Sequence, residues 1–173
     1  MNLLVKHSDV IMTQGTALFM SFALLTALTK YYDLVEMTTI NPAVVAPSGL
    51  DFVPGPGEDL ESMIWVLIYA IMLHHLGSLR GSDKTRYRRF VDEFYGNLSY
   101  SGLAAQHNIM VSYGTNLLAY GPEVWIPDPA QRQWFRLAMT LVEDQTKLTL
   151  RGSTKPITFD AFDALCDEFI TDE

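Results

Sequence analysis

An unbroken apolar run, Met63 to Leu73, most constrains what this chain can fold into. Asp59 and Glu61 precede it, where carboxylates favour the start of a helix. A helix that is apolar on every side must be surrounded by lipid or by other protein. The run would make a rod of about 16 Å, whereas about 20 residues are needed to cross the hydrocarbon layer. The sequence therefore predicts a buried central helix from about Glu58 to His75.

Composition and charge fit a single domain of ordinary size. The chain has 173 residues, is 49% hydrophobic and has a mean hydropathy of +0.11, which is enough to build a core. Its 20 acidic residues outnumber its 12 lysines and arginines, giving a net charge of −8. Nucleic-acid affinity depends on cationic contacts, so no nucleic-acid partner is expected.

Cysteine usage and the N-terminal residues indicate an intracellular protein. Cys166 is the single cysteine and cannot form an internal disulfide, which suits the reducing cytoplasm or nucleus. The apolar stretch 16–28 could pass for the core of a signal peptide. However, Asp9 and only one lysine precede it, and no convincing cleavage site follows. We expect neither secretion nor a membrane partner.

Proline and glycine divide the rest of the chain into helices and one long loop. Segment 33–57 holds four prolines and three glycines, a density that no continuous helix or strand tolerates. The chain is therefore predicted to be mainly α and to form one domain over 1–173. Its predicted parts are a first segment with a helix from Ser21 to Thr29 (1–32), the loop (33–57), the central helix (58–76) and C-terminal helices (77–173) at 82–99, at 101–121 with a break at Gly114, at 128–148 and from Thr158 onward.

Three of the C-terminal helices carry apolar residues at helical spacing, and these stripes are expected to face the core. The carboxylates Glu143, Asp144, Asp163 and Asp167 lie off the stripes and are predicted to be at the surface. The stripes are Tyr87, Phe90, Val91 and Phe94; Trp134, Leu137, Ala138, Leu141 and Val142; and Phe159, Phe162, Cys166 and Phe169.

No catalytic constellation can be found by inspection. His74 and His75 are neighbours on a helix and cannot chelate one metal together, so they are interpreted as polar residues near the helix end. Cys166 is interpreted as a core residue. One basic cluster could hold a phosphate or an acidic partner, or could simply be a solvated helix face. Its members are Arg80, Lys84, Arg86, Arg88 and Arg89.

Two segments together resemble a known family. "GTALFMSFALL" (15–25) resembles the end of a protein kinase activation segment, where the family writes Gly-Thr-x-x-Phe/Tyr-Met-Ala. "EDLESMIWVLIYAI" (58–71) resembles the start of the hydrophobic helix F, in the style of the fungal-type protein kinase family. They occur in the family's order and cover about a sixth of the chain. The resemblance implies the helical C-terminal lobe of a protein kinase-like fold, packed around 58–76.

The family pattern also implies roles for individual residues. Thr16, after Gly15, would belong to the loop that positions the substrate hydroxyl. Asp59 would hold the backbone of the catalytic loop, although an ordinary acid at a helix N-terminus is an equally sufficient interpretation. Met20, Glu61 and Ser62 complete the two motifs as structural residues.

The chain also departs from the family pattern. Ala23 stands where the family has the glutamate that anchors the activation segment. The glycine-rich loop, the strand lysine, the His-Arg-Asp loop and the Asp-Phe-Gly metal motif are not found, and the fourteen residues before Gly15 leave no room for an N-terminal lobe. We expect an incomplete lobe that transfers no phosphoryl group alone. ATP and magnesium are expected only in a complete kinase domain, and no other cofactor or metal is expected.

Three interpretations follow. The first is a fragment of a fungal-type protein kinase domain, whose partner would be the missing N-terminal lobe or another protein. The second is a non-catalytic, pseudokinase-like interaction module built on the basic helix 82–95 and the loop 33–58. The third is an unrelated helical protein whose two motifs match by chance.

Overall fold

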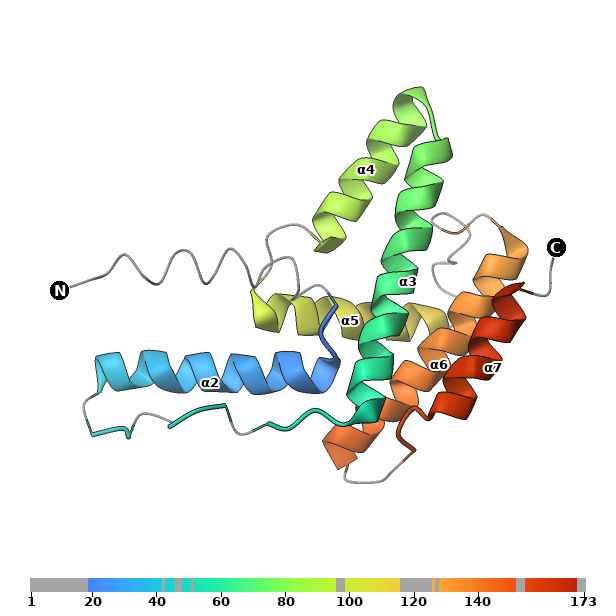
Figure 1. Cartoon of the computed structure of the whole chain (residues 1–173). Coiled ribbons are helices and arrows are strands. Elements are labelled where there is room, and N and C mark those ends of the chain that lie inside the picture. Colours follow the sequence, from blue (N-terminus) through green and yellow to red (C-terminus); the bar gives the residue numbers. More distant parts are fainter. Residues whose placement is uncertain are drawn as a thin grey trace.

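A computed structural model describes residues 19–41, 43–45, 48–50, 52–95, 99–115, 126, 128–151 and 155–170. Within these residues the chain forms helices and no strand, which confirms the mainly α prediction. The helices, drawn in Figure 1, are α2 (Phe22–Ile40), α3 (Pro56–Ser78), α4 (Gly81–Tyr95), α5 (Tyr100–Thr115), α6 (Pro129–Arg151) and α7 (Phe159–Ile170).

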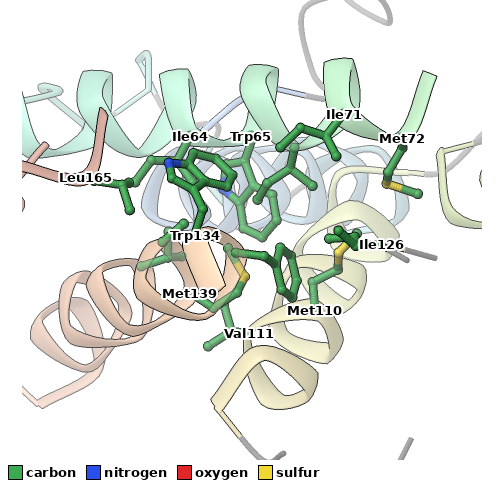
Figure 2. Close-up of a cluster of buried hydrophobic side chains, with 14 of the residues drawn as sticks. Ile64, Trp65, Ile71, Met72, Met110, Val111, Ile126, Trp134, Met139 and Leu165 are labelled. Carbon is green, nitrogen blue, oxygen red and sulfur yellow. The ribbon is translucent and has the colours of Figure 1, made fainter. Parts of the chain in front are cut away.

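Helix α3 has a central position. Figure 1 shows it crossing the molecule, with α2 and α4 on one side and α6 and α7 on the other. One face of α3 is buried, and its side chains meet those of α5, α6 and α7. In Figure 2, Ile64 and Trp65 point toward Trp134 and Met139 of α6 and toward Met110 of α5. A second, smaller cluster joins α2 to α5 through Phe22, Leu25, Leu103 and Ala104.

The prediction that α3 is buried on every side is wrong. Met63, Val66, Leu67 and Leu73, all in the apolar run, are exposed. Met63, Val66 and Leu73 lie on the face opposite the core, and Leu67 lies at the margin of that face, toward α6 and α7, because α3 contacts its neighbours mainly through a single stripe. The helix is also longer than the run, at 23 residues. By length and composition alone it could cross a membrane, a test that the core helix of a soluble protein also passes.

The first helix is longer than predicted. Residues 33–40 were expected to be loop, yet α2 continues through them to Ile40. The first proline comes only at position 42, so nothing in 33–40 interrupts the helical hydrogen bonds. The helix starts as expected, because the hydroxyl of the N-cap Ser21 accepts a hydrogen bond from the backbone N–H of Leu24 at 3.3 Å. Helix α5 likewise passes through Gly114, where a break was predicted, and ends at Thr115.

The apolar stripes were placed correctly in part. Tyr87, Val91, Trp134, Ala138 and Val142 are buried, as predicted.

Other stripe positions differ. Leu137 is 36% exposed, since Phe135 and Met139 take the core-facing side of α6 instead. Phe159 is 69% exposed, because it is the first residue of α7 and Leu165 fills the core from that helix. The side chains of Phe94 and Phe169 lie outside the described part of the chain.

Candidate functional site: a buried carboxylate between α2, α3 and α5

Among the described residues, those that the family pattern singled out do not come together in one site. Gly15 and Thr16 lie outside the described residues. Met20 is half-buried and packs against the small cluster between α2 and α5. Asp59 is exposed in the first turn of α3, as an ordinary N-terminal acid would be. The Ser62 hydroxyl donates a hydrogen bond to a carbonyl of its own helix at 2.9 Å.

Glu61 is the exception among these residues, because its side chain is only 1% exposed. Its Oε1 accepts a hydrogen bond from the backbone N–H of Phe22 at 2.8 Å and another from Trp65 Nε1 at 3.2 Å. Trp65 is one helical turn further along α3, so the two side chains share a face. Phe22 is the first residue of α2, whose N–H groups have no partner within the helix. The carboxylate of α3 therefore caps the start of α2.

The environment of Glu61 alters its acidity. Burial raises the pKa of this carboxyl from 4.5 to about 7, the hydrogen bonds from Phe22 and Trp65 oppose the rise, and the nearby charge of Glu58 adds to it. The second oxygen, Oε2, is buried and accepts no hydrogen bond from any described residue. Near neutral pH the group is therefore divided between its charged and protonated forms. Because it is enclosed, it is suited to controlling packing rather than to acting on an external substrate.

His107 lies beside Trp65, and the four residues Phe22, Glu61, Trp65 and His107 together are called the Glu61 cluster. His107 lies on α5, is buried, and stacks on Trp65 with ring centroids 3.8 Å apart and planes 16° apart. Sequence reasoning assigned nothing to this histidine. A signal was nonetheless present, since His107 falls at helical spacing with Leu103, Ala104, Met110 and Val111, all of which are buried.

A further contact joins the two segments that resemble the kinase family. Phe19, in the first segment, meets Tyr69, in the second, edge to face, with ring centroids 5.6 Å apart. With the hydrogen bond between Phe22 and Glu61, the segments 15–25 and 58–71 touch at two separate points.

A polar relay fixes the beginning of α3. Glu58 Oε2 accepts a hydrogen bond from Gly55 N at 2.9 Å, and its Oε1 accepts one from Gln145 Nε2 of α6 at 3.0 Å. Gln145 Oε1 in turn accepts from Ile157 N, just before α7, at 3.0 Å. Gly57 leaves room for this contact, since a Cβ there would lie 2.9 Å from Gln145 Oε1. No local pattern reveals the relay, because its members are far apart in the chain.

The histidine pair and the cysteine form no reactive site. His75 meets the Tyr87 ring edge-on at 4.7 Å, and burial together with the charge of His74 lowers its pKa. The pKa of the half-buried Cys166 is raised by burial and by Asp163 and Asp167, so it remains a thiol. Among the described residues, no group of three or more His, Cys, Asp or Glu side chains could hold a metal ion.

The charged surfaces match the predictions in part. Arg80, Arg86 and Arg88 are exposed on or beside α4, and Arg86 makes an exposed ion pair with Asp83 at 3.6 Å. Glu143 and Asp144 are half-buried rather than fully at the surface, because α6 lies between α5 and α7.

Comparison with known proteins adds no further constraint. No protein-family model, curated protein or solved structure matches the chain.

Proposed function

We propose that this chain is part of the helical C-terminal lobe of a protein kinase of the fungal type, with α3 in the position of helix F. The proposal rests on one observation, the hydrogen bond from Phe22 N to the carboxylate of Glu61. The bonded residues are 39 positions apart and belong to the two segments that resemble the family. If the two short motifs matched the family by chance, nothing would require the two segments to contact each other in the folded chain. If both segments belong to one kinase lobe, they are required to pack together.

The contact is also of a kind that would hold an activation segment in place. This hydrogen bond would contribute about 1.5–3 kcal/mol when Glu61 is charged and about 0.5–1.5 kcal/mol when it is protonated. Ala23 stands where the family has its anchoring glutamate, so Glu61 would supply an alternative anchor for the segment that follows Gly15 and Thr16. In this proposal Glu61 is a positioning residue and touches no substrate.

In this proposal, nucleotide binding and phosphoryl transfer are carried out by residues outside these 173. The 173 residues contain none of the family's phosphate-binding or metal-binding motifs, and without them developing charge on a phosphoryl group is not neutralised. ATP and magnesium would be bound by a complete domain, in the cytoplasm or nucleus. This chain would contribute the platform on which the substrate rests.

The first test is to sequence the full-length transcript around the coding region. In-frame codons for a His-Arg-Asp loop and an Asp-Phe-Gly motif upstream of Gly15 are expected. Transcripts that consistently lack both motifs would overturn the proposal.

The second test is an assay of phosphoryl transfer from ATP and magnesium to serine and threonine peptides. The product of the whole gene is expected to be active and the 173-residue chain alone inactive. A reproducible activity of the chain alone that is lost in Asp59→Asn would contradict the division of roles proposed here.

A second candidate function is a non-catalytic interaction module, and α4 favours it. Figure 1 shows α4 beside the end of α3 at one edge of the molecule, where its arginines are open to an acidic partner. Such a module would be monodisperse and would melt cooperatively by itself, as light scattering and calorimetry would show. A lobe lacking its partner would instead self-associate through exposed apolar surface.

A further inference from the structure

A cavity of about 440 Å³ lies between α3, α6 and α7 and is open to solvent on one side, where its lining residues Leu67, Ala70 and His74 are exposed. None of the residues discussed under the proposed function lines it. Its volume falls in the range of pockets that hold small organic molecules, about 300–1,000 Å³. The lining residues are Leu67, Ala70, Ile71 and His74 from α3, Gln131 and Trp134 from α6, and Cys166 from α7.

Rigid elements form the walls of this cavity. Leu67, Ala70, Ile71 and His74 follow the three- and four-residue spacing that places them on one face of α3. Gln131 and Trp134 are one turn apart on α6, and Figure 2 shows Trp134 and Ile71 between the two helices. A site on packed helices holds its shape before a ligand arrives, which lowers the entropy lost on binding.

The chemistry of the lining selects a type of ligand. Most of the wall is aliphatic or aromatic, and His74 and Gln131 add polar, hydrogen-bonding side chains to it. None of the lining residues is a lysine or arginine. On the α7 side, burial and then the nearby carboxylates of Asp163 and Asp167 raise the pKa of Cys166, so a negatively charged ligand would be disfavoured there as well.

We propose that this cavity binds a neutral, largely apolar small molecule, about the size of two or three fused aromatic rings, whose single polar group bonds to His74 or Gln131. The proposal is independent of the kinase-lobe proposal, because it uses none of the residues of the Glu61 cluster. The proposal specifies the charge of the ligand as well as its size. An anionic analogue of the same ring system is expected to bind more weakly.

The single cysteine of the chain provides a direct readout. Cys166 is the only thiol, so its modification by a soluble disulfide reagent reports on the cavity wall alone. The probes are 2-naphthol, neutral at pH 7, and 2-naphthoate, its carboxylate counterpart. At a 2-naphthol concentration about ten times its Kd, the modification rate is expected to fall up to about tenfold, because the bound ligand covers the part of the half-buried thiol that lines the cavity. 2-Naphthoate is expected to protect less at equal concentration.

Two variants of α3 separate cavity binding from general adsorption. Ala70→Trp places a bulky ring in the cavity from an exposed position, and is expected to abolish protection by 2-naphthol. Val66→Trp adds the same ring one turn away, on an exposed position that does not line the cavity, and is expected to retain it. Equal protection in both variants would overturn the proposal, as would stronger protection by 2-naphthoate.

Nuclear magnetic resonance of the unaltered chain gives a second measurement that does not depend on either variant folding. Titration with 2-naphthol is expected to shift the side-chain amide of Gln131 and the indole N–H of Trp134, and to leave the indole N–H of Trp65 unchanged. Saturating probe without shifts at Gln131 and Trp134 would also overturn the proposal.

Discussion

At the scale of single residues, Glu61 connects α3 to α2 and couples folding to the binding of a proton. Its carboxylate is buried, caps α2 and accepts a hydrogen bond from Trp65, while its second oxygen has no hydrogen bond from a described residue. The folded chain therefore binds a proton at Glu61 at a pH where the unfolded chain has released it. Because the folded pKa is about 7 and the ordinary value 4.5, this stabilisation is full below about pH 4.5 and is lost as the pH rises through 7.

Glu61→Gln is expected to remove this pH dependence. From pH 5.5 to pH 8, above the pI near 4.9, the Glu61 proton should account for a loss of about 2 kcal/mol in the free energy of unfolding. Urea unfolding at several pH values measures it as the difference between the parent and Glu61→Gln. The matched control is Asp59→Asn, an exposed acid in the same helix, which is expected to keep the parent slope. A Glu61→Gln variant with that same slope would contradict the assignment.

Glu61 also shows why sequence identifies candidates but not their environments. Both Asp59 and Glu61 could be recognised as acids at the start of an apolar helix. Only Glu61 falls in register with Trp65 and Ile68, and its partner Phe22 is 39 residues away. The spacing of Glu61 with Trp65 and Ile68 can be read from the local sequence, whereas the contact with Phe22 cannot. His107 was missed because the apolar pattern of 101–121 was too weak to show that this histidine falls on a buried face.

At the scale of the helices, patterning predicted which helices exist better than where they end. The start of α2 lies where it was predicted, near Ser21, whereas its end was misplaced, because the prolines and glycines of 42–57 were taken to indicate a loop from residue 33 onward. Residues such as Leu34 and Met37 continue the helix although they are exposed. The faces of α3 were misjudged because an uninterrupted apolar run has no polar side to mark the solvent. Its buried stripe is set by the helices that pack on it.

The turn between α3 and α4 offers a test of backbone conformation. Gly81 begins α4 with φ of +58°, a conformation that costs most other residues about 1 kcal/mol. Gly77 lies inside α3, one residue before its end, in ordinary helical conformation. At both glycines an added Cβ would have no atom within 4 Å among its non-local neighbours, so packing is the same for both.

Alanine substitutions at these two glycines are expected to have opposite effects. Gly81→Ala should lower the free energy of unfolding by about 1 kcal/mol, and Gly77→Ala should raise it by about 0.5 kcal/mol, since alanine favours helix. Urea unfolding of the two variants beside the parent measures both. Changes of the same sign would show that the turn is not set by the conformation of Gly81.

At the scale of the whole molecule, exposed apolar surface is the main unexplained feature. Met63, Val66 and Leu73 on α3 are open to solvent, and so is Ile40 at the end of α2. Single exposed apolar residues are common, but Met63, Val66 and Leu73 share one side of α3, so we expect this stripe to act as an association surface. The net charge of −8 opposes association and does not remove the stripe.

The chain is expected to self-associate reversibly through this stripe. The double variant Val66→Lys with Leu73→Lys should raise the concentration at which half the chains associate by at least about tenfold, because two apolar contacts are lost. Light scattering coupled to size-exclusion chromatography measures this, and Ser112→Lys, on exposed α5 surface, controls for added charge. Association unchanged by the double variant would exclude the stripe, and a parent chain monomeric at every concentration would favour the interaction module.

The hydrogen bonds that fix the start of α3 determine how early during synthesis the fold can be completed. Glu58 bonds to Gln145, 87 residues later, and Gln145 bonds to the backbone at Ile157. A chain emerging from the ribosome would have its central helix exposed long before these partners exist, at about 5–20 residues per second. The apolar run must therefore spend several seconds without its core, which leaves this helix open to chaperones and to aggregation during synthesis.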